Sequence, residues 1–178
     1  MEVELVRWKE EYYEDFFQCS KDKDLYDNMS DDFPHTEEEC RQAVASFVES
    51  DGKKACYRAI LVNGRVCGCI AAFFETGMYC KNAEIAYWIR KEERGKGIMT
   101  GVIAGFVSTL FSDFNIHRVY ARPFLHNVAS CKVLEKAGFA EEGVLQDSVY
   151  KKGSIYSAVI YAIIKELHCK NNESLDSE

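Results

Sequence analysis

The apolar residues of this chain repeat with two different periods, and the change of period separates strands from helices. The alternating segment VELVRW predicts a first strand, and the apolar positions of EEYYEDFFQCS recur at helical spacing. An irregular acidic segment, KDKDLYDNMSDDFPH, follows this helix. Thr36 and Glu39 then fit a capping box, which predicts a second helix from about Glu37 to Val48.

The middle of the chain has the pattern of a β-hairpin followed by one more strand. Two apolar runs, CYRAILV and RVCGCIAAFF, flank Asn63 and Gly64, a dipeptide that favours the type I′ turn of a two-residue hairpin. The segment AEIAYWI predicts a fourth strand, and it leads directly into the stretch EERGKGIMTG. Apolar residues from Ile98 to Phe111 recur at helical spacing, so a long helix is predicted immediately after the glycines.

The last third of the chain predicts one helix and three strands. HRVYARPF is expected to form a fifth strand, and Asn127 to cap a helix that stops at Gly138. The segments SVYKK and IYSAVIYAII, joined by a turn at Gly153, predict the final pair of strands. This order predicts an α+β fold in a single domain, with helices on the faces of a mixed sheet. We expect the domain to span residues 1–168 and a polar C-terminal tail to span residues 169–178.

Charge and composition narrow the classes of partner. The chain of 178 residues carries 22 basic and 29 acidic residues, a net charge of −7, which argues against nucleic acid or an anionic membrane as a partner. No apolar run approaches the roughly 20 residues that span a bilayer, and the charged N-terminus is not that of a signal peptide. The eight cysteines are scattered without a C-x-x-C motif, which predicts reduced, buried thiols in a cytoplasmic protein. The histidines have no metal-ligand spacing, so no metal is expected.

The stretch EERGKGIMTG has the composition of a phosphate-binding loop at the start of a helix. Gly95 and Gly97 allow a ligand to approach the backbone amides, and the helix dipole adds partial positive charge there. Arg94 and Lys96 supply full charges. The alternative is an ordinary tight loop with solubilising charge. The stretch is not a P-loop, because Gly97 follows Lys96, and it is not the dinucleotide fingerprint, which needs a glycine in place of Thr100.

The motif RGKGIM after a strand, followed further along by NVASCKVLEKAGF, resembles the GNAT superfamily of acyl-CoA-dependent N-acyltransferases. More narrowly, the chain is similar to the group containing the ribosomal-protein N-terminal acetyltransferases and the spermidine acetyltransferases, over nearly its whole length. The family pattern Arg/Gln-x-x-Gly-x-Gly/Ala maps onto Arg94, Gly97 and Met99, and Met99 departs from it. The resemblance implies a GNAT-like fold with a mostly antiparallel sheet of about seven strands and about four helices. Its fourth and fifth strands, here Glu84–Arg90 and His117–Pro123, are expected to splay apart.

The resemblance also implies direct transfer of an acetyl group from acetyl-CoA to a primary amine in a ternary complex. The diphosphate is expected on the amides from Arg94 to Thr100, and the backbone of the fourth strand is expected to pair with the pantetheine arm. Asn127 commonly binds the cofactor arm in such proteins, and it can cap a helix at the same time. The residues expected to contact acetyl-CoA are Trp88, Ile89, Arg94, Gly95, Lys96, Gly97, Ile98, Met99, Thr100, Asn127, Ser130 and Lys132.

Proton transfer requires two further groups. An amine attacks only when neutral, so a base or a water relay must take its proton, and the leaving thiolate benefits from a proton donor. Many relatives place a tyrosine seven residues after the asparagine, where this chain has Leu134. The ribosomal-protein-like branch resembles Asn-x-x-Ser, which matches Asn127 and Ser130, so Ser130 is the predicted acid and a capping role is its alternative. Glu84 is the predicted base, acting through a water, and a solvated edge carboxylate is the alternative.

The acceptor is expected between the first two helices and their connecting segment, in contact with Phe33, Glu84 and Tyr87, while Trp88 is expected to pack in the core. The concentration of acids there would attract a cationic amine, although a solvated acidic loop is the alternative. These acids are Asp24, Asp27, Asp31, Asp32, Glu37 and Glu38.

Two other functions stay open at this stage. One is a non-catalytic acyl-CoA-binding module, which the absence of a tyrosine at Leu134 favours. The other is an α/β interaction domain whose glycine loop binds nothing. The acceptor is either a small molecule or a peptide, and the protein is expected to be a monomer or a homodimer.

Overall fold

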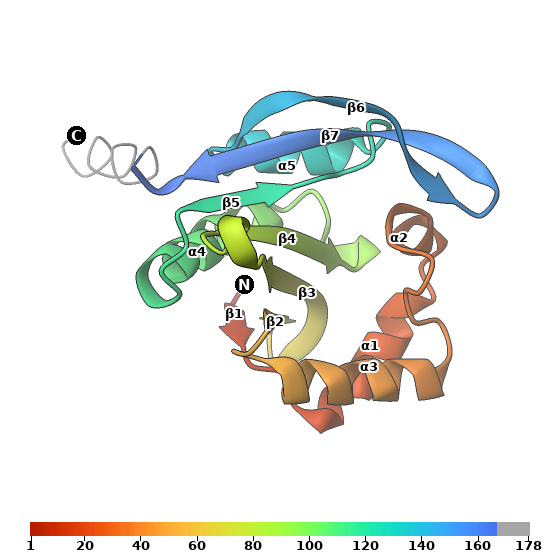
Figure 1. Ribbon diagram of the computed structural model, residues 1–178. Coiled ribbons are helices and arrows are strands. Elements are labelled where there is room, and N and C mark those ends of the chain that lie inside the picture. Colours follow the sequence, from red (N-terminus) through yellow and green to blue (C-terminus); the bar gives the residue numbers. More distant parts are fainter. Residues whose placement is uncertain (167–178) are drawn as a thin grey trace. The chain divides into compact units, whose positions relative to one another are not determined.

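The computed structural model describes residues 1–166 and contains one seven-stranded sheet in the order β1-β2-β3-β4-β5-β7-β6 (Figure 1). Its residues form two compact units. The first unit comprises Met1–Phe73 and Ala86–Val102, and the second comprises Phe74–Ile85 and the residues from Ile103 onward. The predicted tail, residues 169–178, lies outside the described residues.

The strands of the first unit form an antiparallel meander. They are β1 (Val3–Val6), β2 (Ala55–Val62) and β3 (Arg65–Phe74). The predicted hairpin turn is confirmed, because Asn63 and Gly64 have φ angles of 49° and 78°, as a type I′ turn requires. Gly68 in β3 faces β4, and a Cβ built there would lie 2.5 Å from the carbonyl oxygen of Trp88. Only glycine lets the two strands approach this closely.

The helices of the first unit precede the hairpin. They are η1 (Glu10–Tyr12), α1 (Tyr13–Ser20), α2 (Lys23–Asn28) and α3 (Glu37–Ser50). The capping box of α3 is confirmed, since the Glu39 amide donates to Thr36 Oγ1 at 3.2 Å and the Thr36 amide donates to Glu39 Oε2 at 3.1 Å. Helix α2 corrects the prediction, because it lies in the segment expected to be irregular. It has six residues and buries only Leu25, so it is too short to show a helical period.

The second unit is built on β5 and a long C-terminal hairpin, on which α5 packs (Figure 1). The first half of β4 belongs to this unit and pairs in parallel with β5 from Asn82↔Arg118 to Glu84↔Tyr120, and β7 pairs antiparallel with both β5 and β6. The remaining elements of residues 1–166 are η2 (Gly77–Tyr79), β4 (Asn82–Ile89), η3 (Lys91–Glu93), α4 (Ile98–Asp113), β5 (Arg118–Ala121), α5 (Val128–Lys136), β6 (Ala140–Lys151) and β7 (Ser154–Ile164).

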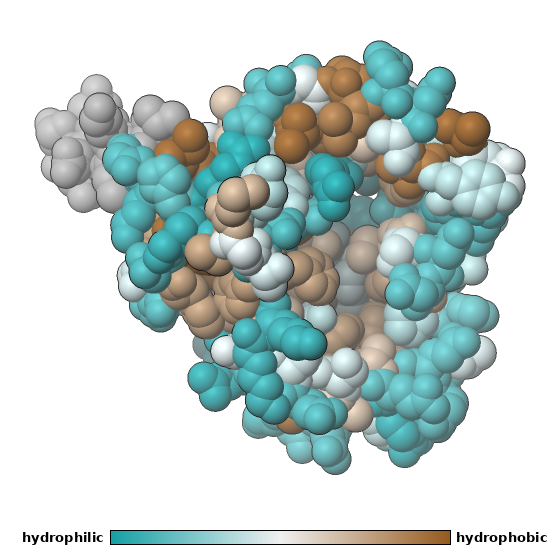
Figure 2. Space-filling view, viewed as in Figure 1, coloured by the Kyte–Doolittle hydropathy of each residue, from teal (hydrophilic) through white to brown (hydrophobic). Residues whose placement is uncertain are grey.

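Strand β6 is much longer than the predicted segment SVYKK, which begins at Ser148. Its first half hides the period of two, because the register with β7 shifts between Glu141 and Gly143 and again between Leu145 and Val149. Such bulges move side chains to the other face of a sheet. The β6–β7 hairpin carries apolar surface (Figure 2) to which exposed Leu145 and Ile155 contribute.

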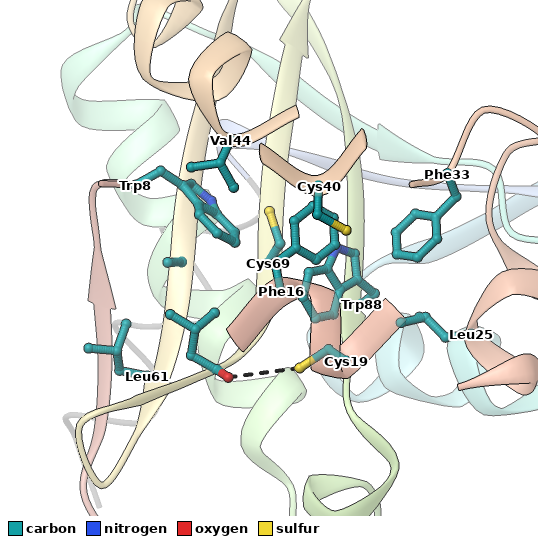
Figure 3. Close-up of a cluster of buried hydrophobic side chains, with 12 residues drawn as sticks. Trp8, Phe16, Cys19, Leu25, Phe33, Cys40, Val44, Leu61, Cys69 and Trp88 are labelled. Atoms are coloured by element: carbon teal, nitrogen blue, oxygen red, sulfur yellow. Dashed lines mark hydrogen bonds between the residues drawn. The ribbon is translucent and has the colours of Figure 1, made fainter. Parts of the chain in front are cut away.

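The core of the first unit contains four buried aromatic rings among cysteine and aliphatic side chains (Figure 3). Phe16 of α1 is 1% exposed and stacks on Trp88 of β4, with ring centroids 5.0 Å apart. Phe33 packs edge-on against both rings. Burial of side chains of this size contributes about 2 kcal/mol each, so the end of β4 is firmly anchored in the first unit.

Seven cysteines of the described residues are free thiols, and five of them are buried. Burial raises the pKa of the Cys19 thiol to about 12, which keeps it protonated and unreactive. Within residues 1–166, no cluster of side chains suits a metal ion, and no helix is long and apolar enough to cross a membrane.

Candidate functional site

The glycine loop, residues 94–97, connects η3 to the first turn of α4. Gly95 and Gly97 have φ angles of 75° and 76°, in the left-handed region that favours glycine. A Cβ built at either position meets nothing within 4 Å, so the space in front of this backbone is open. The Gly101 amide donates to the Gly97 carbonyl at 3.3 Å, which places Gly97 directly before the helix.

The first amides of α4 therefore follow the open glycines. The amides of Ile98, Met99 and Thr100 have no acceptor within the helix, because a helix leaves its first N–H groups unpaired. The side chains of Ile98 and Met99 are each only 6% exposed, so these residues can offer a ligand their backbone but not their side chains. The buried Met99 side chain, which departs from the family pattern, therefore leaves its backbone amide as the group that a predicted phosphate cradle would use.

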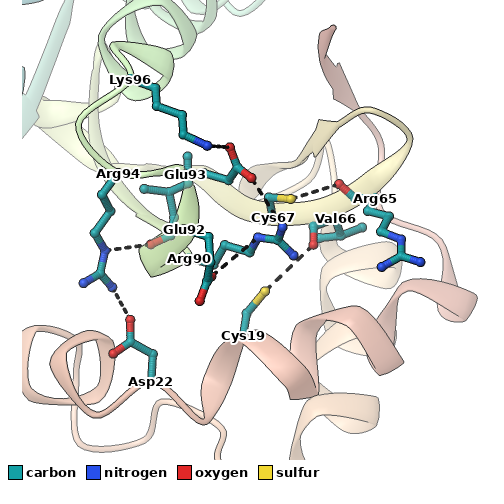
Figure 4. Close-up of polar contacts among 11 residues, drawn as sticks. Cys19, Asp22, Arg65, Val66, Cys67, Arg90, Glu92, Glu93, Arg94 and Lys96 are labelled. Atoms are coloured by element: carbon teal, nitrogen blue, oxygen red, sulfur yellow. Dashed lines mark hydrogen bonds and ion pairs between the residues drawn. The ribbon is translucent and has the colours of Figure 1, made fainter. Parts of the chain in front are cut away.

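The positive charge of Lys96 is locally compensated. Its Nζ lies 2.9 Å from Glu93 Oε2, and Arg90 Nη2 donates to the other oxygen of the same carboxylate at 3.3 Å (Figure 4). Glu93 is 8% exposed. The hydrogen bond from Lys96 and its charge hold the pKa of the Glu93 carboxyl below its ordinary value, with a smaller contribution from Arg90.

Arg94 is also paired, with a segment far away in the sequence. Its Nη2 donates to Asp22 Oδ2 at 2.5 Å, and its Nε donates to the Ile89 carbonyl at 3.2 Å. Asp24 approaches the same guanidinium at 3.7 Å. The two cations predicted to bind phosphate thus already face carboxylates, so anion binding by this loop stays a prediction that depends mainly on its backbone amides.

The predicted contacts on β4 and in the segment between α2 and α3 differ in burial. Trp88 is 5% exposed, which confirms its expected place in the core, and its backbone remains the part that a ligand can use. Phe33 is also buried in this core, and Tyr87 is half-buried. As contacts of an acceptor, Phe33 and Tyr87 stay predictions.

In the second unit, Glu84 belongs to a cluster of four polar residues that we call the polar cluster: Glu75, Glu84, Tyr120 and Arg122. Arg122 donates from Nε and Nη2 to the two carboxylate oxygens of Glu84, at 2.9 and 2.6 Å. Glu84 pairs in register with Tyr120, whose hydroxyl donates to Glu75 Oε1 at 2.5 Å. Burial and this hydrogen bond raise the pKa of the Tyr120 phenol well above its ordinary value, so it stays protonated.

Sequence reasoning missed three members of the polar cluster. Tyr120 and Arg122 lie two residues apart on or just after β5, and this period-two spacing was the available signal. Their relation to Glu84 depends on the parallel register of β4 and β5, which no local pattern encodes.

Asn127 caps α5 as predicted, with Oδ1 accepting from the Ser130 amide at 3.2 Å. Ser130 therefore occupies the first-turn position that was its alternative reading, and the amide nitrogen of Asn127 is not part of this bond. Lys132 is exposed, whereas Leu134 is fully buried.

Some of the acidic residues near α2 and α3 form ion pairs within their own helices. Asp27 pairs with Lys23 at 2.9 Å, and Glu37 pairs with Arg41 at 3.2 Å, both four residues apart. Such pairs stabilise helices modestly. They account for part of the acidic concentration without an acceptor.

Known proteins resemble this chain over most of its length. YdaF of Bacillus subtilis (strain 168), provisionally named a ribosomal N-acetyltransferase, is 34% identical over 106 residues, which cover 60% of this chain and 57% of YdaF. The spermidine N(1)-acetyltransferase of Vibrio cholerae is 23% identical over 168 residues, covering 93% of this chain and 83% of that enzyme. The chain thus spans less than two thirds of YdaF but most of the second relative.

The fold also matches a solved structure, that of the microcin C7 self-immunity acetyltransferase MccE in complex with acetyl-CoA and AMP. The TM-score is 0.83 at 21% identity, with 92% of each chain covered. The model of the acetyltransferase (GNAT) domain matches residues 2–140. The chain therefore belongs to the GNAT family of acetyltransferases, which confirms the family and the fold predicted from its sequence.

Proposed function

We propose that this protein transfers an acetyl group from acetyl-CoA to a primary amine by direct attack in a ternary complex. The observation that carries the proposal is the open backbone at Gly95 and Gly97, directly before the first amides of α4. Unpaired amides at a helix N-terminus suit a diphosphate, and family membership specifies acetyl-CoA as its source. Acetyl-CoA supplies the thioester carbonyl that the amine attacks.

The residues of the chain fit this donor in chemistry. The amides of residues 98–100 bind the diphosphate, and Lys96 and Arg94 add charge when they exchange their carboxylate partners for phosphate. The backbone of Trp88 and Ile89 pairs with the amides of the pantetheine arm. Asn127 donates from its amide nitrogen while its oxygen caps α5, with Ser130 and Lys132 as further contacts.

In the proposed reaction Glu84 takes the proton of the attacking amine through a water. The two-point bond from Arg122 fixes the orientation of the carboxylate and leaves a second lone pair on each oxygen. Ser130 hydrogen-bonds the sulfur of the leaving thiolate. Tyr120 is a second candidate for hydrogen bonding the sulfur; its hydroxyl would first have to turn away from Glu75, and its raised pKa makes it a weaker acid than an ordinary phenol.

The acceptor is proposed to be a cationic small molecule or peptide amine. The net charge of −7 supports this, as do the carboxylates of the α2–α3 segment, such as Asp32, which concentrate negative charge there. The names of the two relatives refer to ribosomal and spermidine acetylation, and both acceptor types carry amines. We further propose a cytoplasmic protein without a nucleic-acid partner, as a monomer or homodimer; the free buried thiols support the compartment.

The test is release of free CoA thiol from acetyl-CoA across a panel of polyamines, aminoglycosides and peptides with free N-termini. We expect turnover with at least one cationic amine and none with its N-acetylated form. The buried Leu134 favours a second function, a non-catalytic acyl-CoA-binding module. Binding of acetyl-CoA without turnover on any amine would support that module, and absence of binding would end both proposals.

A further inference from the structure

The Arg94–Asp22 ion pair joins two segments of the first unit that are 72 residues apart in the sequence (Figure 4). Arg94 opens the glycine loop, and Asp22 is the N-cap of α2. The Arg94 side chain is 34% exposed and that of Asp22 is 16% exposed, so the pair is shielded from solvent better than a surface ion pair.

Asp22 uses its two carboxylate oxygens for different partners. Oδ1 accepts from the Asp24 amide at 3.0 Å and caps α2, while Oδ2 accepts from Arg94 at 2.5 Å. The position of α2 is therefore tied to the guanidinium of the glycine loop through one side chain.

A diphosphate on the amides of α4 would bring negative charge to the loop that already carries this ion pair. Asp22 and a phosphate would then share the charge of one guanidinium, and a phosphate close to Asp22 is repelled by its carboxylate. We propose that Asp22 is an internal counter-anion of the glycine loop, so that occupation of the loop by a diphosphate and anchoring of α2 oppose each other. The inference rests on the proposed function, and the coupling is reciprocal by linkage.

The substitution Asp22→Asn isolates the charge, because asparagine caps helices as well as aspartate does. We expect the variant to bind CoA about fivefold more tightly in titration calorimetry, the size expected for loss of one partly shielded ion pair. Inorganic pyrophosphate should show the same direction. In the wild type, CoA should speed hydrogen exchange of the amides of α2, Lys23–Asn28.

The matched control is Asp24→Asn. Asp24 lies 3.7 Å from Arg94, its side chain is 67% exposed, and the substitution should change CoA affinity by less than about twofold. Unchanged or weaker CoA binding by Asp22→Asn, with normal binding by the wild type, would overturn the counter-anion role alone. If the wild type binds neither CoA nor pyrophosphate, both the proposed function and the counter-anion role of Asp22 are overturned.

Discussion

The glycine loop of the first unit and the polar cluster of the second present their chemistry in different ways. The loop offers backbone amides in front of two open glycines, and its two cations are already paired with Asp22 and Glu93. The polar cluster offers only side chains, held by the Glu84–Arg122 and Tyr120–Glu75 bonds. The first candidate site depends on backbone conformation, and the second depends on the register between strands β4 and β5.

Because of this difference, different kinds of substitution should impair the glycine loop and the polar cluster. A backbone site is damaged by filling space, since removing any one side chain leaves its amides in position. A side-chain site is damaged by changing a single functional group, even when the volume stays the same.

The largest effect is expected for Gly97→Glu. Its side chain would enter the open space before α4 and place a negative charge where we propose the diphosphate binds. We expect CoA affinity to fall at least about 100-fold, measured by calorimetry, through repulsion and lost access to the amides.

The matched control for this variant is Gly52→Glu. Gly52 has the same φ angle of 76° and the same open surroundings, so the substitution adds equal charge and backbone strain in the first unit but outside the glycine loop. Its CoA affinity should equal that of the wild type. Equal losses in both variants would show that strain, and not the position of the charge, governs binding.

The next largest effect is expected for Glu84→Gln. If Glu84 takes the proton, turnover should fall about 100-fold, the usual contribution of a general base, while CoA affinity stays the same. The measurement is steady-state release of CoA thiol at saturating acetyl-CoA.

The control for loss of an ion pair is Glu142→Gln. Glu142 accepts a two-point bond from Arg118 of β5, so its geometry resembles that of the Glu84–Arg122 pair in the same unit, and the Arg118 guanidinium lowers the pKa of the Glu142 carboxyl. Full activity of Glu84→Gln, or equal losses in both variants, would remove Glu84 from the reaction and leave Tyr120 and its partner Glu75 as the group to test.

The contrast also explains how far the sequence predicts this molecule. Local sequence signals, such as Asn63-Gly64 and the Thr36–Glu39 capping box, predict the glycine loop, the hairpin turn and the two helix caps. The structure contains all of these features. Helix α2 is too short for a period, and the bulges of β6 erase its alternation. The pairing of Arg94 with Asp22 is tertiary, so a loop that reads as strongly cationic is largely neutralised in the fold.

A moderate effect on stability is expected for Gly68→Ala. The added Cβ would lie 2.5 Å from the Trp88 carbonyl oxygen and 3.3 Å from Ile89 Cα, so β4 must shift away from β3. Overpacking of this kind costs about 1–3 kcal/mol in the free energy of unfolding, measured by denaturant titration.

Gly105→Ala is the matched control for this cost. Gly105 is an exposed residue inside α4 with nothing within 4 Å of an added Cβ, so alanine should stabilise the protein by about 0.5–1 kcal/mol. Gly68→Ala should also weaken CoA binding, because the displaced residues are those proposed to pair with the pantetheine arm. Unchanged binding in a destabilised Gly68→Ala variant would show that the backbone of β4 does not contact the donor.

The smallest effect is expected for Glu93→Gln, and its direction depends on pH. Lys96 and Arg90 keep the pKa of the Glu93 carboxyl below its ordinary value, so its ionic contribution to stability is fully present above the unfolded pKa. This contribution is lost as the pH falls through the lower pKa of the folded state. The variant should therefore melt below the wild type near neutral pH, and the difference should shrink in acid. Because the substitution also releases the half-exposed Lys96, CoA affinity should rise by up to about twofold. A melting difference that is constant from neutral to acid would mean that Glu93 stabilises the glycine loop by packing and not by charge. The ion pairs of the loop would then contribute less to its stability than their short distances suggest.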